Sequence, residues 1–155
     1  MKNISHYLAH LSVTAWVGSL WAIGYLAAPV LFYAQPDRQL AGLLAGELFV
    51  RVGYLGMICG TYLLIYHFAQ SGRTVLRKRT FWVIAGMLAI SLLIQFGIQP
   101  VMSEIKASVA SPDVMGSASS AKFKMLHGLS SIAYLIESLL GIYLVVVSQG
   151  SRQSK

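Results

Sequence analysis

The sequence predicts an all-α protein: a four-helix membrane bundle with an additional interfacial or extended helical segment before the second span. Hydrophobic residues make up 56% of the 155 residues and charged residues only 11%, whereas soluble domains carry about 25% charged residues. Four stretches supply the roughly 20 apolar residues that a helix needs to cross a bilayer. We therefore expect one transmembrane domain over residues 1–150 and a polar cytoplasmic tail at 151–155.

Unbroken apolar runs set the four predicted spans. The first, about 4–33, contains no Lys, Arg, Asp or Glu. It is too long for a signal-peptide core, so we expect it to be a retained helix. The second is about 52–70, and its single cysteine, Cys59, is interpreted as a small buried apolar residue. The third and fourth spans are predicted at about 81–101 and 125–147.

Pro36 and Asp37 predict a helix start well before the second span. Proline is tolerated in a first helical turn, and an acidic side chain suits the positive end of the helix dipole. From Pro36 the helical pattern runs without a breaker to Gln70, a stretch of 35 residues. As one helix this stretch would be roughly 50 Å long, which exceeds the thickness of a bilayer. Its first part is therefore expected to lie on the outer interface, to kink or to project.

Basic residues predict the orientation. With four spans, both termini and the loop between the second and third spans share one side. That side carries no acidic residue and seven basic ones, Lys2, Arg73, Arg77, Lys78, Arg79, Arg152 and Lys155. The positive-inside rule places this side in the cytoplasm. The basic run at 73–79 lacks interleaved aromatic residues, so we expect it to touch lipid headgroups rather than nucleic acid.

Polar residues within the spans predict which faces turn inward, because polar atoms in hydrocarbon lack partners. The fourth span carries them at steps of three and four, at His127, Ser130, Ser131, Tyr134, Glu137, Ser138 and Gly141. The third span has one such face, with Ser91, Gln95 and Gln99. The first span has a polar stripe formed by His6, His10, Thr14, Gly18, Trp21 and Tyr25. We expect all three faces to form the bundle core.

Glu137 is the centre of the candidate intramembrane site. It lies about 12 residues, or roughly 18 Å, into its span and therefore close to the membrane midplane. A carboxyl group at this depth has to be protonated or hydrogen-bonded. It either carries a proton or a cation, or joins helices as a neutral acid, and the sequence leaves both roles open. The candidate polar site comprises Glu137, Gln95, Gln99, Tyr134, His127 and Ser130.

Three histidines are candidate ligands for a metal or a haem. His6, His10 and His67 all fall toward the predicted cytoplasmic ends of the first two spans. His6 and His10 are one helical turn apart, so they could chelate a metal ion, or one could bind a haem iron. The alternative is interfacial histidines satisfied by water or a carbonyl group. Since no spacing here is diagnostic of a metal site, no cofactor is predicted.

Four segments carry a resemblance to a known family: WVGSLWAIGYLAAPVLF, LAGLLAGELF, QFGIQPVMSEIK and LHGLSSIAYLIESLLG. In this order and spacing they resemble the domain-of-unknown-function family 4149, bacterial membrane proteins related to eukaryotic transmembrane protein 205. The resemblance implies a small four-helix protein of the bacterial inner membrane with no defined biochemical role, and no catalytic assignment comes with it. The matching positions include Trp16, Gly18, Pro29, Gln99, Pro100, His127, Gly128, Ser130 and Tyr134.

Three functions fit these observations. The first is a non-enzymatic bundle that packs with or assists another membrane protein, or forms a homo-oligomer. The second is a small transporter or permeation element that uses Glu137, Gln95 and Gln99. The third is a haem- or metal-binding redox protein that uses His10, an interpretation also suggested by a looser similarity of layout to four-helix haem or copper membrane proteins. The sequence holds no nucleotide-binding motif or nucleophile–base pair, so the first function is preferred.

Overall fold

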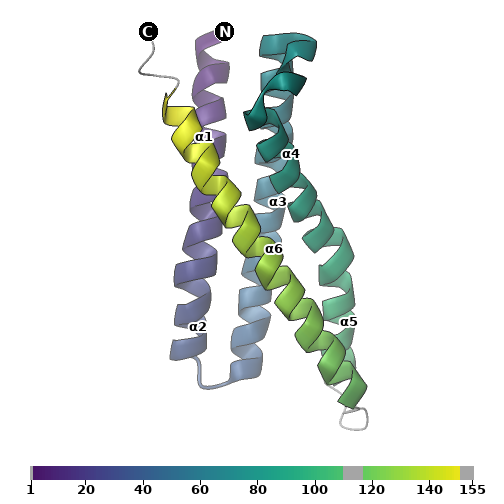
Figure 1. Cartoon of the computed structure of the whole chain (residues 1–155). Helices are drawn as coiled ribbons and strands as arrows, with labels where there is room; N and C mark the ends of the chain where they lie inside the picture. The colour runs from purple at the N-terminus through teal and green to yellow at the C-terminus, as the bar shows by residue number, and fades with distance from the viewer. Residues whose placement is uncertain (1, 110–116, 151–155) are drawn as a thin grey trace.

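The computed structural model describes residues 2–109 and 117–150, and every element within these ranges is helical. Four long helical rods make up the bundle (Figure 1). The first rod comprises α1 (Lys2–Trp21), the π-helical η1 (Ala22–Ala27) and α2 (Ala28–Ala34). The second is α3 (Arg38–Ser71), followed by the short 3-10 helix η2 (Gly72–Arg77). The third comprises α4 (Arg79–Leu92), the π-helical η3 (Leu93–Ile98) and α5 (Gln99–Val109), and the fourth is α6 (Ser117–Gly150).

Four helical segments are long and apolar enough to cross a membrane, which confirms the predicted membrane bundle. Each is longer than its predicted span: the first by a single residue, and the other three because their helices continue past the apolar run into flanking residues. The segments are Ile4–Ala34, Arg38–Arg77, Arg79–Ile105 and Ala121–Ser148. The predicted polar tail at 151–155 lies outside the described residues.

The segment before the second span is an extension of that span. The Asp37 carboxylate caps α3 by accepting hydrogen bonds from the backbone N–H groups of Gln39 (2.8 Å) and Leu40 (3.2 Å). Such a cap satisfies N–H groups that have no partner within the helix. From this cap α3 continues for 34 residues, which corresponds to about 51 Å. Of the three arrangements expected for this segment, the structure shows a continuous extended helix.

The core lies where α1 packs against α3, and α4 and α6 pack against that pair. Trp16 of α1 is the largest fully buried side chain, and it lies over Gly56 and Gly60 of α3. A Cβ atom at Gly56 would come within 2.4 Å of Trp16 Nε1, and one at Gly60 within 2.8 Å of Trp16 Cη2. These glycines, four residues apart, therefore provide the space that the indole ring fills.

The prediction that the polar stripe of α1 and η1 turns into the core is largely wrong. His6, Thr14 and Gly18 are exposed, and Trp21 and Tyr25 are 39% and 50% exposed. The buried face of α1 is a different one, formed by Ala9, Val13, Trp16, Val17 and Leu20. Packing of the Trp16 ring against the two glycines fixes this rotation of α1, because shape complementarity here outweighs the polarity of the other face.

Helix α6 crosses the bundle obliquely, packing against α1 and α4, and against α5 near its beginning (Figure 1). The beginning of α1 and the end of α6 lie at the same end of the bundle, where α3 also turns into α4 (Figure 1). This arrangement is the one that four spans require. That this end lies in the cytoplasm stays a prediction, based on the charge distribution.

Candidate intramembrane site

A buried hydrogen bond joins Glu137 of α6 to Ser91 of α4. The Ser91 hydroxyl donates to Glu137 Oε1 over 2.6 Å, and Ser91 and Glu137 are only 4% and 2% exposed. Both residues lie well inside their predicted spans. The polar faces of the third and fourth spans therefore meet at this pair, as the sequence predicts. A hydroxyl donor lowers the cost of placing the carboxyl group away from water.

Trp16 of α1 lies against the carboxyl group of this pair. Its indole N–H is buried and interacts with the Glu137 carboxyl group, but the approach misses the geometry of a hydrogen bond. Side chains from α1, α4 and α6 thus converge on the acid. Neither Trp16 nor Ser91 is among the residues predicted for the site, although the spacing of Gly56 and Gly60 indicates that a large side chain packs against them.

Two π-helical segments lie close to the buried acid along the chain. In the first rod η1 follows the turns of α1 that carry Trp16, and in the third rod η3 follows the end of α4 that carries Ser91. Such segments are rare and are often found at functional sites. The Tyr134 hydroxyl donates to the backbone carbonyl of Leu20 over 2.5 Å, close to the start of η1. The Tyr134 ring lies over Gly24, where a Cβ atom would come within 2.4 Å of it. Tyr134 therefore joins α6 to the irregular part of the first rod.

Gln95 and Gln99 continue the polar face of the third rod beyond Ser91. Gln95 is buried in η3, with its Oε1 atom against Gly53 of α3: a Cβ atom there would come within 2.6 Å of this oxygen. Gln99, at the start of α5, is half-buried. Among the described residues, no hydrogen bond joins either glutamine to Glu137. Gln95 therefore packs at the interface with α3 and is not a hydrogen-bond partner of Glu137.

His127 and Ser130 lie nearer the other end of α6. His127 is exposed and stacks on Phe123, with ring centroids 6.1 Å apart. Its backbone carbonyl accepts hydrogen bonds from the hydroxyls of Ser130 (2.9 Å) and Ser131 (2.8 Å). His127 is ten residues from Glu137, or roughly 15 Å along the helix. The structure therefore brings Glu137 together with Ser91 and Trp16, but not with His127 and Ser130.

The N-terminal histidines form a separate pair. The Nε2 atoms of His6 and His10 are 3.2 Å apart, and His6 Nδ1 is 3.3 Å from the Tyr66 hydroxyl of α3. His67 is not part of this pair; it packs edge-on against the Tyr66 ring, at a centroid distance of 5.5 Å. Within the described part of the chain, no group of three or more His, Cys, Asp or Glu residues is arranged to hold a metal ion.

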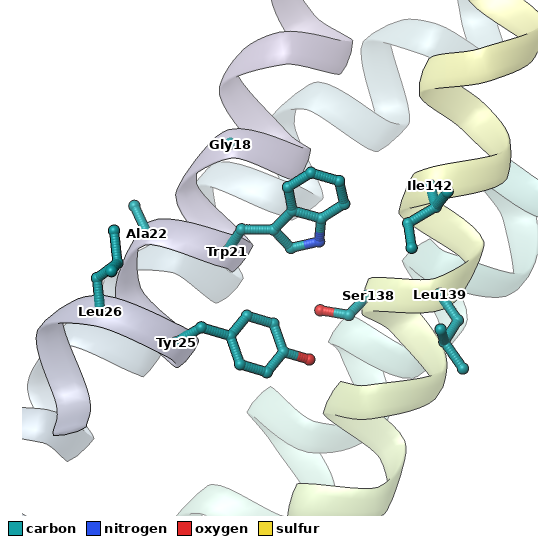
Figure 2. A pocket seen from close by; sticks show the side chains of 8 residues that line it. All are labelled: Gly18, Trp21, Ala22, Tyr25, Leu26, Ser138, Leu139 and Ile142. Atoms are coloured by element: carbon teal, nitrogen blue, oxygen red, sulfur yellow. The ribbon is translucent and has the colours of Figure 1, made fainter.

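A groove lies between the first rod and α6, on the outer side of the bundle. Its volume is about 620 Å³. Figure 2 shows Trp21 and Tyr25 on one side of it and Ser138 on the other, with the Ser138 hydroxyl turned toward the two aromatic rings. Ser138 is 3% exposed, and its hydroxyl has no hydrogen-bond partner among the residues that the structure describes. The lining residues are Gly18, Trp21, Ala22, Tyr25, Leu26, Ser138, Leu139 and Ile142.

The fold and this buried acid define a class, the multi-pass helical membrane proteins with an ionisable side chain sealed inside the bundle. Within it, the chain belongs to the family described as Domain of unknown function (DUF4149), whose model matches residues 11–111. The matched region includes Trp16, Ser91 and Gln95 but ends before α6, so Glu137 and Ser138 lie outside it. Neither the curated proteins nor the solved structures include a match to this chain.

Proposed function

We propose that this protein is a non-enzymatic membrane component that binds a transmembrane helix of another membrane protein in the groove between the first rod and α6. The observation that carries the proposal is the Ser138 hydroxyl, which is buried, unpartnered and turned into the groove. A buried polar group without a partner is costly, and it is most costly where no water is available. A partner that supplies a hydrogen bond would remove this cost.

Several other serines show that Ser138 differs from the usual serine in these helices. A helical serine commonly satisfies its hydroxyl by bonding back to a carbonyl three or four residues earlier. Serines in three of the four rods of this protein do so, namely Ser19, Ser103, Ser130, Ser131 and Ser148. Ser138 instead directs its hydroxyl across the groove, as expected of a side chain that bonds to an external group.

The depth of the groove favours a protein helix over a lipid. Trp21, Tyr25 and Ser138 lie within roughly 10 Å of the middle of their spans. Lipids offer only hydrocarbon at this depth, whereas a helix can offer hydroxyl, amide and carbonyl groups. Trp21 and Tyr25 each carry one polar group, and both residues are substantially exposed. An exposed polar stripe on α1 and η1 is therefore explained if another helix covers it.

Small residues on the first rod provide the space for such a helix. Gly18 and Ala22 are four residues apart and both line the groove. Space beside Gly18 is open, since a Cβ atom built there would meet no atom within 4 Å. Small residues at this spacing let the backbones of two helices approach closely. The groove therefore combines a small-residue surface with polar groups, the two features that bring membrane helices together.

Glu137 is better suited to holding the bundle together than to transport. Its carboxyl group is sealed between Ser91 and Trp16, and Glu137 is not among the residues that line the groove. A transport site has to be reached by its substrate. We therefore assign Glu137 to joining α4 and α6, and the groove to binding.

Photo-crosslinking in native membranes tests this function. A photoreactive amino acid is placed at Leu139 inside the groove and, as a control, at Ile132, which is exposed on α6 outside the groove. We expect Leu139 to give an adduct with a transmembrane peptide of another protein, identified by mass spectrometry, and Ile132 to give lipid adducts. Lipid adducts alone at Leu139, or peptides of this chain itself, would contradict the proposal.

A matched pair of glycine substitutions separates groove binding from a general effect on the membrane protein. Gly18→Leu fills the groove, whereas Gly86→Leu makes the same change in α4, where the space beside the glycine is equally open. We expect the Leu139 adduct to disappear in the first variant and to remain in the second. If both variants keep the adduct, the partner does not occupy the groove.

A further inference from the structure

The pair formed by His6 and His10 has the geometry of two ligands on one metal ion. The two Nε2 atoms are 3.2 Å apart, and the residues are one turn apart on α1. Metal–imidazole bonds of about 2.0–2.1 Å that enclose an angle of about 90–110° place the two nitrogen atoms about 2.8–3.4 Å apart. The observed separation falls within this range, so one metal ion could bind both Nε2 atoms at their present spacing.

Contacts from α3 hold this part of α1 in place. The Tyr66 hydroxyl lies 3.3 Å from His6 Nδ1, and the Tyr62 hydroxyl donates to the Ser5 carbonyl over 3.1 Å. The two tyrosine rings stack, with centroids 6.3 Å apart. Metal-binding histidines usually donate their second ring N–H to such a partner, which orients the ring and leaves the other nitrogen free to bind. Tyr66 is placed to do this for His6.

We propose that His6 and His10 bind one divalent transition-metal ion through their Nε2 atoms, with Tyr66 as the residue that orients His6. Imidazole prefers Cu²⁺, Zn²⁺ and Ni²⁺ among these ions, and Cu²⁺ is expected to bind most tightly. On binding, the hydrogen between the two Nε2 atoms moves to an Nδ1 atom, so both rings stay neutral. Water completes the coordination, because His6 is exposed near the beginning of its span.

The surroundings favour a small ion over a haem and exclude His67 from the site. Two residues on one helical face reach a metal from the same side, whereas two axial haem ligands bind from opposite faces of the ring. His67 contacts the Tyr66 ring edge-on and lies close enough to the Lys78 ammonium group to interact with it. A neighbouring cation opposes the binding of a second positive charge. The site therefore consists of His6 and His10.

Copper binding to the purified full-length protein tests this site. The protein carries an affinity tag without histidines and is titrated with Cu²⁺ in detergent, with bound metal measured by equilibrium dialysis. Electron paramagnetic resonance reports the nitrogen ligands. We expect one tightly bound Cu²⁺ per chain, with a spectrum that shows two imidazole nitrogens. Absence of this signal in the wild-type protein would overturn the proposal without reference to any variant.

Substitutions then locate the ion. We expect His6→Gln and His10→Gln each to weaken binding at least about tenfold, and Tyr66→Phe to weaken it by about tenfold. His67→Gln is the matched control and should bind as the wild type does. Circular dichroism checks that each variant is folded. A double variant, His6→Gln with His10→Gln, that still binds one Cu²⁺ with unchanged affinity would place the ion elsewhere and refute the site.

Discussion

The hydroxyl of Ser91 donates a 2.6 Å hydrogen bond to the carboxyl group of Glu137, deep inside the bundle. The two residues belong to α4 and α6, which are 46 residues apart in the chain at this point. Their contact explains how an acid can lie at the centre of a transmembrane helix. It also makes Glu137 part of the interface between two rods, and this role leads to the first prediction.

Removal of either partner should destabilise the bundle. Glu137→Ala leaves the Ser91 hydroxyl buried without a partner, which costs about 1–3 kcal/mol in the free energy of unfolding. Glu137→Gln keeps an acceptor oxygen and should stay close to the wild type. Ser91→Ala should cost about 0.6 kcal/mol, the average for hydrogen bonds between membrane helices, and at most about 1.7 kcal/mol. Unfolding in a denaturing detergent measures all three. Additive effects of Ser91→Ala and Glu137→Ala in the double variant would show that the two side chains do not interact.

The cellular effect of Glu137→Gln distinguishes structure from function. If the acid only joins helices, this variant should be produced at wild-type levels and keep the groove adduct formed from Leu139. Loss of the adduct in a variant that unfolds as the wild type does would show that ionisation of Glu137 matters for binding. Protein levels and crosslinking yield in the same membranes measure the two effects separately.

Packing of Trp16 against α3 gives the second prediction. Gly56→Ala places a methyl group 2.4 Å from Trp16 Nε1, so the two helices have to separate or the ring has to move. Overpacking of this kind typically costs about 1–3 kcal/mol. Gly86→Ala adds the same methyl group where the space is open and should have little effect. Equal stability of the two variants would show that Trp16 does not lie against Gly56.

The cap on α3 gives the third prediction. Asp37→Ala removes the acceptor for two backbone N–H groups and should cost about 0.5–2 kcal/mol. Asp37→Asn keeps an acceptor oxygen in the same place and should remain within a few tenths of a kcal/mol of the wild type. Hydrogen exchange of the amides of Gln39 and Leu40 measures the protection that the cap provides. Faster exchange is expected only in the alanine variant.

Orientation in the membrane gives the fourth prediction. Seven basic residues and no acidic ones flank the side that holds both termini, so this side should be cytoplasmic. Reporter fusions at Lys155 and at Asp113 should report opposite compartments, with Lys155 inside. If both fusions report the same compartment, the chain does not cross the membrane four times.

The architecture followed from the sequence because apolar runs of this length have few alternatives to transmembrane helices. The meeting of the polar faces of the third and fourth spans followed from the sequence, since their side chains need partners away from lipid. Ser91 as the particular partner of Glu137 did not follow, because the predicted site held Gln95, Gln99 and Tyr134 instead. The rotation of α1 could not be obtained in this way. It depends on the fit of Trp16 to Gly56 and Gly60. These residues lie in different helices, and the spacing of polar residues within one helix does not reveal such a fit.

The groove also could not be predicted from the sequence. Ser138 and Glu137 are adjacent in the sequence, and both are buried, but they face different neighbours. Adjacent residues on a helix point about 100° apart, so one can join α4 while the other faces the first rod. Only the path of α6 across the bundle determines which of the two is left without a partner.

Labelling by a lipid-borne photoreactive reagent tests the central claim, that another helix covers the groove in the membrane. Ile58 and Ile65 of α3 are exposed on the bundle surface and serve as references. In native membranes we expect Tyr25 and Leu139 to be protected while the references are labelled. After purification and reconstitution into vesicles of the same lipids, all four should be labelled. Labelling of Tyr25 and Leu139 as strong as that of Ile58 in native membranes would show that lipid alone fills the groove, and would contradict the account.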